Sequence, residues 1–149
     1  MYSLMYRNVN FSLGGLNSGF MIAQVTASAL VSENKTLVHP ASVDSISTSA
    51  GYEDHVSMGG WAARKGLIVI ENVENILAIE LLCACQAIDL RRPLTSTPIL
   101  EKLHAEVRHH VKFMNQDHIL ADDIKKIRML IENSHLWDIV KDHIEQHTD

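Results

Sequence analysis

One segment of this sequence runs for the length of a helix without a charged side chain. Residues 18–31 are apolar or small, with a few uncharged polar residues among them, and the first charged residue that follows is Glu33. Asn17 or Ser18 is a suitable N-cap for a helix that begins here. A helix that is apolar all round must be covered all round, and small residues such as Ala23 let neighbouring helices approach closely. The segment therefore predicts a helix buried on nearly all sides at the centre of a bundle, although 149 residues offer little to bury it with.

The composition agrees with an all-α fold. Hydrophobic residues make up 46% of the chain, which is enough for a core, whereas three prolines, seven glycines and 5% aromatic residues are few for a turn-rich β-protein. The formal charge of −5, with 13 basic against 18 acidic residues, argues against a dedicated nucleic-acid binder. The sequence shows no signal-peptide pattern and no apolar run of membrane-spanning length. We expect a soluble, cytoplasmic protein with no nucleic-acid or membrane partner.

A structured loop is predicted to follow the apolar helix. His39-Pro40 ends the helix, and residues 40–60 hold five serines, a threonine and three glycines without a helical period. Functional residues concentrate on loops that a rigid scaffold carries. Two carboxylates beside an imidazole can transfer protons when the fold separates their pKa values, whereas an exposed acidic loop is the simpler interpretation. The polar residues that the loop collects are Asp44, Tyr52, Glu53, Asp54 and His55.

Hydrophobic periodicity predicts further helices after the loop. Apolar residues recur every three or four positions up to Leu90, and the basic pair in Arg91-Arg92-Pro93 suits the end of a helix. A proline fits the first turn of the next helix. The predicted helices run from Met58 or Trp61 to about Leu90, from Thr97-Pro98 onward, and from Ala121 into a charged tail, and the residues before Gly14-Gly15 form an extended N-terminal segment.

The two cysteines are predicted to be buried free thiols. Cys83 and Cys85 are two residues apart, so on a helix their side chains point about 200° apart and cannot readily form a disulfide. A Cys-x-Cys pair can begin a metal site, but this sequence has no second cysteine pair. Free thiols are also typical of a reducing compartment, which favours the cytoplasm.

Nine histidines are many for a chain of this length. His104, His109 and His110 fall on a predicted helix, and no glutamate completes a zinc-protease His-Glu-x-x-His pattern, so we expect them to be solvated and to bind no metal. A small protein that binds a metal or transfers protons through Glu53, His55 and the two cysteines is a weaker alternative.

Several long, ordered runs of residues match a single known pattern. The runs are Gly15–Gln24, Leu30–Lys35, His39–Ile46, Thr48–Ala50, Glu53–Gly59 and Ala84–Asp89. On these runs, which lie within roughly residues 14–130, the chain resembles the histidine ammonia-lyase family, one of the aromatic amino-acid lyases. A match of this length is far more specific than a short motif. The resemblance implies a lyase-type bundle of long helices.

The resemblance also implies an enzymatic activity, and it implies that this chain lacks the residues that form the electrophile. Enzymes of this family remove ammonia from an amino acid, histidine giving urocanate, and bind no external cofactor. Their electrophile is a methylidene-imidazolone ring that forms from an internal Ala-Ser-Gly triplet in the N-terminal portion, and this sequence has no such triplet. The resemblance therefore implies that residues 1–149 are one partial domain, the C-terminal third of a lyase, which holds no catalytic residue and is inactive alone.

Glu53 gains a role from the resemblance. It matches the glutamate that faces the substrate side chain in histidine-type enzymes, where phenylalanine- and tyrosine-type relatives tend to carry glutamine. A carboxylate there accepts a hydrogen bond from an imidazole N–H, which a benzene ring cannot offer. The family usually reads Ala-Asn-Gln-Glu, whereas Gly51 and Tyr52 precede Glu53 here, and Ser47 replaces a proline. Glu53 and Tyr52 are the predicted substrate-binding residues.

The resemblance further implies partners. Members of the family are tetramers in which long helices of four chains pack together and each active site takes residues from more than one subunit. We accordingly expect a homo-oligomer or a complementing N-terminal lyase subunit, with histidine as the small-molecule substrate. A non-catalytic helical scaffold, the oligomerisation remnant of a truncated lyase gene, remains the alternative function.

Overall fold

Helices make up nearly all the regular structure of the chain. The computed structural model describes residues 19–145, and within them there is no β-strand, only an isolated bridge between Thr48 and Glu53. The predicted all-α fold is confirmed, and the expected extended N-terminal segment and N-cap at Asn17 or Ser18 lie outside the described residues. The helices are α2 (Gly19–Leu37), η2 (Ala41–Asp44), η3 (Ser49–Gly51), α3 (Gly59–Leu90), α4 (Pro98–His110), α5 (Ala121–Glu132) and α6 (His135–Glu145), where η marks a short 3-10 helix.

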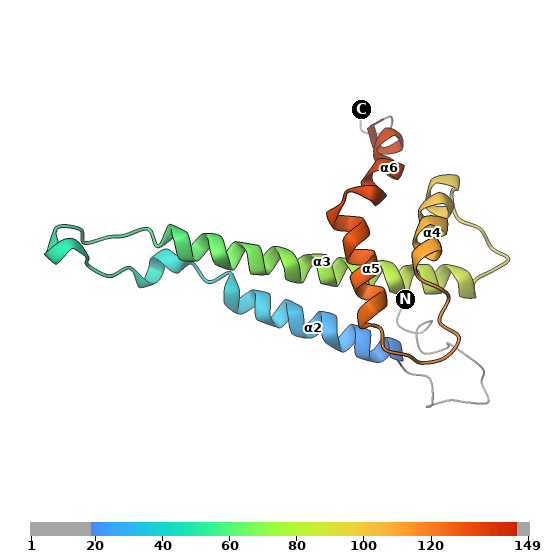
Figure 1. Cartoon of the computed structure of the whole chain (residues 1–149), viewed down its shortest axis with the longest axis horizontal. Helices are drawn as coiled ribbons and strands as arrows, with labels where there is room; N and C mark the ends of the chain where they lie inside the picture. Colours follow the sequence, from blue (N-terminus) through green and yellow to red (C-terminus); the bar gives the residue numbers. More distant parts are fainter. Residues whose placement is uncertain (1–18, 146–149) are drawn as a thin grey trace.

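The helices form two regions that differ in shape. α2 and α3 run side by side as a hairpin whose connecting loop lies at the far end, while α4, α5 and α6 gather around the other end of α3 (Figure 1). We call residues 30–70 the arm and residues 19–29 with 71–145 the head. The long helix α3 belongs to both regions, so it sets where the loop lies relative to the head.

The ends of the first two helices follow the sequence signals. α2 ends at Leu37, two residues before His39-Pro40, and α3 ends at Leu90, directly before Arg91-Arg92-Pro93. The loop between α2 and α3 is ordered by η2, η3 and the isolated bridge, so the predicted structured loop is confirmed. None of the described helices is both long and apolar enough to cross a bilayer.

The C-terminal helices agree with the sequence except in the tail. α4 has Pro98 in its first turn, as predicted, and α5 begins at Ala121 with two acidic residues where the helix dipole favours them. α5 stops at Glu132, and Ser134 has a φ of 56°, which turns the chain. The predicted charged tail is therefore a separate helix, α6, which buries Leu136 in the core of the head.

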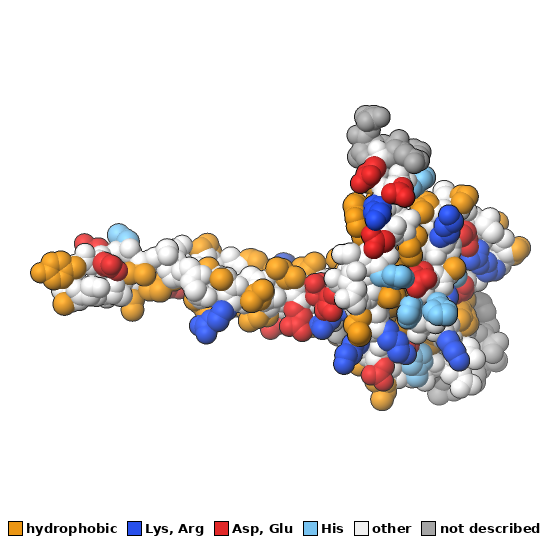
Figure 2. All heavy atoms as spheres, turned by 45° about the horizontal axis from the view of Figure 1, so that its top comes forward, with side chains coloured by type: hydrophobic (Ala, Val, Ile, Leu, Met, Phe, Trp, Pro, Cys, Tyr) orange, Lys and Arg blue, Asp and Glu red, His pale blue; other side chains and the backbone are white. Residues whose placement is uncertain are grey.

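The burial predicted for the uncharged helix is wrong for this chain by itself. Only Phe20 and Ala23 of α2 are buried, and Ile22 and Val25 are 59% and 55% exposed. The reason is geometric, because α3 is the main neighbour along α2 and one neighbour covers only one stripe of a helix. Hydrophobic side chains also lie along the visible face of the arm in Figure 2.

The hydrophobic core lies in the head. Cys83 and Cys85 are buried free thiols, as predicted, and burial raises the pKa of each to about 11. The core joins α3 to α2, α4, α5 and α6. Its buried members are Phe20, Ala23, Ala78, Ile79, Leu82, Cys83, Cys85, Val107, Val111, Met114, Ile127, Leu130 and Leu136.

A buried polar network connects α3 to α4 and to the segment after it. Gln86, 2% exposed, donates to Met114 O (2.7 Å) and accepts from Met114 N (3.1 Å) and from Arg108 (3.2 Å). Arg108 also donates from Nε to Asp89 Oδ2 at 2.7 Å. Because a buried polar group without a partner is costly, these paired groups fix α4 on α3.

The histidines of α4 are only partly as expected. His109 and His110 are exposed, but His104 is 7% exposed, so its predicted solvation is wrong. His104 occupies the face of α4 that packs on α3, and its Nε2 lies 2.9 Å from Asp89 Oδ1, close enough for an ion pair but not aligned for a hydrogen bond.

Candidate functional site

The loop at the end of the arm is closed by a tight turn. Thr48 and Glu53 pair through their backbones, with Thr48 N donating to Glu53 O (2.9 Å) and Glu53 N donating to Thr48 O (3.3 Å). Between them, Ala50 (φ 54°, ψ 34°) and Gly51 (φ 88°) have the positive φ values that the two central residues of a type I′ turn require. Glycine suits this position because it has no Cβ to clash there.

The side chain of Glu53 is held from within the loop. Thr48 Oγ1 lies 3.1 Å from Glu53 Oε2, and the hydroxyl is the donor because an ionised carboxylate can only accept. Glu53 and its neighbour Tyr52 are both exposed, Tyr52 to 92%. The structure thus presents the two predicted substrate-binding residues at the tip of the arm, with no described residue covering them.

The loop carries further polar ties that hold its two sides together. Val56 N donates to Ser45 Oγ at 2.7 Å, three residues away from the Thr48–Glu53 pair on each side. At the base of the loop, the side chain of Lys65 donates to the carbonyl oxygen of His39. Lys65 is only 9% exposed, and it is the one buried side chain in residues 30–70.

A further set of side-chain hydrogen bonds joins α2 and α3 at the boundary between the arm and the head. Asn72 Nδ2 lies 3.0 Å from Glu33 Oε2 and 2.9 Å from Asn34 Oδ1, and Asn72 is 7% exposed. A buried amide with such partners favours one register of the two helices, because sliding either helix would leave it unpaired. The loop therefore closes on a helical hairpin whose alignment is fixed.

The alternative metal or proton-transfer set is not assembled. No ion pair links His55 to Glu53 or Asp54 in the described part of the chain, and all three residues are exposed. Cys83 lies 24 residues beyond the start of α3 at Gly59, which is about 36 Å along a helix. Within residues 19–145, no three or more His, Cys, Asp and Glu side chains are grouped to hold a metal ion.

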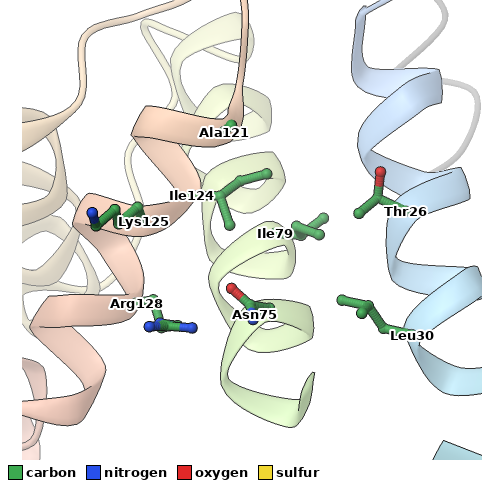
Figure 3. A pocket seen from close by; sticks show the side chains of 8 residues that line it. All are labelled: Thr26, Leu30, Asn75, Ile79, Ala121, Ile124, Lys125 and Arg128. Carbon is green, nitrogen blue, oxygen red and sulfur yellow. The ribbon is translucent and has the colours of Figure 1, made fainter. Parts of the chain in front are cut away.

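A cavity of about 360 Å³ lies between α2, α3 and α5 (Figure 3). Its polar side chains are largely engaged, since Arg128 pairs with Glu71 at 2.9 Å and Thr26 donates to its own helix. Sequence reasoning missed this cavity because it joins segments far apart in the chain. It is a mostly apolar hollow rather than a reactive centre. The lining residues are Thr26, Leu30, Asn75, Ile79, Ala121, Ile124, Lys125 and Arg128.

Sequence reasoning also missed three residues that shape the loop. Ser45, Thr48 and Lys65 each make a contact across it, and the matched runs that contain Ser45 and Thr48 do not indicate these contacts. The only available signal was a glycine-containing turn between Thr48 and Glu53, which brings residues five positions apart face to face.

The chain is similar to known proteins over most of its length. A family model for aromatic amino acid lyases matches residues 4–109. The histidine ammonia-lyase of Bos taurus is 58% identical over 134 residues, which cover 90% of this chain and 20% of that protein. The corresponding protein of Desulfotalea psychrophila is 60% identical over 119 residues, 80% of this chain and 23% of that protein. The chain therefore spans about a fifth of the length of these curated relatives.

Solved structures give the same picture of the fold. The crystal structure of histidine ammonia-lyase from Trypanosoma cruzi superposes with a TM-score of 0.85 at 51% identity, covering 93% of this chain and 29% of that one. A tyrosine aminomutase from Streptomyces globisporus superposes with a TM-score of 0.79 at 35% identity, covering 85% of this chain and 24% of that one. The arrangement of arm and head is thus one that longer chains also adopt.

Proposed function

The chain belongs to the aromatic amino acid lyase family, and from this we propose that it is the C-terminal portion of a histidine ammonia-lyase-like enzyme. The reaction of that enzyme is the non-oxidative removal of ammonia from L-histidine to give urocanate. The identity of more than half the aligned residues to proteins named histidine ammonia-lyase supports this substrate. The buried free thiols support a reducing, cytoplasmic location.

The observation that carries the proposal is the presentation of Glu53. Its carboxylate stands at the tip of the arm, with Oε2 bonded to Thr48 and with Oε1 making no hydrogen bond within residues 19–145. An imidazole N–H of histidine is a suitable donor to Oε1, and a protonated imidazole binds a carboxylate more strongly still. Tyr52 lies next to this position and contributes a phenol ring to the wall of the binding site.

The chain's own role is to bind and orient the substrate. The methylidene-imidazolone of the family cannot form from these residues, because the sequence has no Ala-Ser-Gly triplet. No step of the elimination is assigned to this chain, and we propose that it is inactive until an N-terminal lyase portion joins it. Neither role requires an external cofactor or a metal ion.

The exposed apolar residues of the arm support assembly with other chains. Leu67 and Ile70 of α3 are 68% and 56% exposed, and Val31 of α2 is 43% exposed. Covering such side chains is favourable by about 25 cal/mol per Å² of apolar surface. We propose that copies of this chain, together with a complementing N-terminal lyase subunit, cover them and enclose the loop.

The test is reconstitution of activity. This chain would be co-expressed with the N-terminal portion of a histidine ammonia-lyase, and urocanate formation from histidine would be followed by its absorbance. We expect activity from the complex and none from either part alone. A stable complex of the two parts without activity would contradict the proposal.

A single substitution tests the role of Glu53 in that complex. Glu53→Gln keeps the shape but removes the charge, so we expect at least a tenfold loss of kcat/KM for histidine, the size typical of a hydrogen bond to a charged group. Asp54→Asn is the matched control, because Asp54 is also exposed but has no such contact. An unchanged rate in Glu53→Gln would show that Glu53 does not face the imidazole.

The second candidate is a non-catalytic scaffold, which the exposed apolar surface of α2 and α3 also favours. The two functions differ in what they require of the loop. A scaffold needs the helices but not Glu53, so it predicts that the chain forms oligomers while the complex with an N-terminal portion makes no urocanate. Light scattering combined with the activity assay separates the two, and a monomeric chain that never assembles contradicts both.

A further inference from the structure

We propose that Thr48 is a positioning residue that orients the Glu53 carboxylate and leaves Oε1 as the oxygen that binds the substrate's imidazole. This inference rests on the proposed substrate-binding role of Glu53. Thr48 Oγ1 and Glu53 Oε2 are 3.1 Å apart, and no other hydrogen bond to the Glu53 side chain occurs within residues 19–145. The orientation of this carboxylate within the chain therefore depends on a single hydroxyl.

The backbone fixes the position of that hydroxyl. Thr48 and Glu53 are joined by two backbone hydrogen bonds, of 2.9 and 3.3 Å, so their side chains start from directly opposed positions. The turn between them is held by two more, from Gly51 N to Thr48 O (3.1 Å) and from Tyr52 N to Ser49 O (3.2 Å). The partners are thus brought together by the main chain before the side chains meet.

The conformation of the turn is an unusual one. Ser49, Ala50 and Gly51 have φ values of 53°, 54° and 88°, a region that residues with a Cβ rarely occupy. Backbone of this kind persists where the surrounding structure over-determines it, here through the hydrogen bonds of the turn. In this loop its effect is to reverse the chain within a few residues, which sets Glu53 opposite Thr48.

The chemistry of threonine suits this role. Its hydroxyl can donate while the ionised carboxylate can only accept, so the proton lies on the Thr48 side of the contact. Its β-branch restricts χ1, which holds the hydroxyl in one direction more firmly than serine does. With Oε2 engaged, Oε1 is the oxygen left to accept from an imidazole N–H.

The chain offers matched variants for a test. Thr48→Val keeps the shape and the β-branch but removes the donor, and Thr48→Ser keeps the donor. Ser45→Ala is the control, because Ser45 ties the same loop through Val56 N but does not touch Glu53. All three would be made in the full chain.

The first measurement is NMR on the full chain alone, which requires no activity. Side-chain couplings and the carboxyl carbon shift of Glu53 report its rotamers and its hydrogen bonding. We expect one dominant rotamer in the unsubstituted chain, averaging over several in Thr48→Val, restoration in Thr48→Ser and no change in Ser45→Ala. Identical Glu53 couplings in the unsubstituted chain and in Thr48→Val would overturn the inference.

The second measurement is kinetic, in the reconstituted complex. We expect Thr48→Val to raise KM for histidine by about 5- to 10-fold with kcat within about twofold, since a lost orienting hydrogen bond weakens binding. If Glu53→Gln lowers activity while Thr48→Val leaves KM unchanged, the role of Thr48 is refuted and the proposed function stands. If Glu53→Gln has no effect, the proposed role of Glu53 fails, and the NMR measurement still decides whether Thr48 orients the carboxylate.

Discussion

The arm and the head share one helix but are stabilised in opposite ways. In the head, side chains from each of the five α-helices of residues 19–145 form a hydrophobic core around α3. In the arm, residues 30–70, no hydrophobic side chain is buried, and the one buried side chain is Lys65. This chain therefore encloses its own core only at one end. The other end, which carries the candidate site, is held by polar contacts and leaves apolar side chains exposed.

The polar contacts of the arm show how such a segment keeps its shape. Lys65 caps the carbonyl of His39 just past the end of α2. Glu33 and Asn34 of the arm accept hydrogen bonds from Asn72 at the edge of the head, which fixes α2 against α3. A cation near the C-terminal end of a helix is also favoured by the helix dipole. Directional contacts of this kind define a register with little buried area.

The largest expected effect on stability comes from truncating a buried side chain in the core of the head. Ile127 is fully buried, so Ile127→Ala should lower the free energy of unfolding by about 2–5 kcal/mol. The matched substitution in the arm, Ile70→Ala, should change it by less than about 0.5 kcal/mol, because Ile70 is 56% exposed. Urea unfolding of the isolated chain measures both. Equal losses at the two sites would break the distinction between head and arm.

A somewhat smaller loss is expected from the buried polar network. Gln86→Leu keeps the volume but leaves the backbone N–H and C=O of Met114 unpaired in the core, so it should cost about 2–4 kcal/mol. Glu80→Leu, at an exposed position of the same helix, is the control and should stay within about 0.5 kcal/mol. Unfolding curves that coincide for the two variants would show that the network contributes nothing.

In the arm, the expected effect is local. Lys65→Met removes the donor to His39 O and should cost about 1.5–3 kcal/mol, the size of a hydrogen bond from a charged group. Amides of residues 38–58 should exchange hydrogen faster, while those of α5 should not. Arg64→Met is the neighbouring control, since Arg64 is exposed and only stacks on Trp61. Loop exchange rates that do not respond to Lys65→Met would contradict the role given to it.

The smallest expected effect lies on the surface of the head. A hydrogen bond from Arg92, helped by the backbone N–H of Ser96, lowers the pKa of Glu101 from 4.5 to about 2. The folded state therefore gains stability from Glu101 at pH above about 4.5 and loses it as the pH falls toward 2. Glu101→Gln should flatten this part of the stability curve slightly, as expected for an exposed pair. A curve unchanged between pH 5 and 2 would show that the pair has no effect on folding.

Much of the fold follows from local signals in the sequence. The end of α3 and the start of α4 follow from Pro93 and Pro98, because a proline acts through the backbone alone. The break before α6 was missed, since it depends on the positive φ of Ser134, a serine in a charged stretch. Burial was the least predictable property, because it depends on which elements meet, as the buried His104 and the exposed Ile22 show.

The candidate site, too, was predicted only in part from the sequence. Glu53 was identified through a resemblance that extends over most of the chain, and the exposed loop that carries it was predicted from composition. The hydrogen bond from Thr48 could not be predicted, because it arises from three consecutive positive φ values that the sequence around Gly51 does not announce.

The continuity of α3 has one more consequence. This helix begins at Gly59 and reaches the edge of the head at Glu71. Between these two residues it runs without a break for about 18 Å, at 1.5 Å per residue. Such a rod acts as a lever, so a tilt of about 5° where the head grips it swings the loop end by about 1.6 Å. Misplacement of this size is enough to cost an enzyme about a hundredfold in rate. Side chains such as Gln86 and Ile127, which hold α3 in the head, thereby help to set the position of Glu53, although they lie far from it.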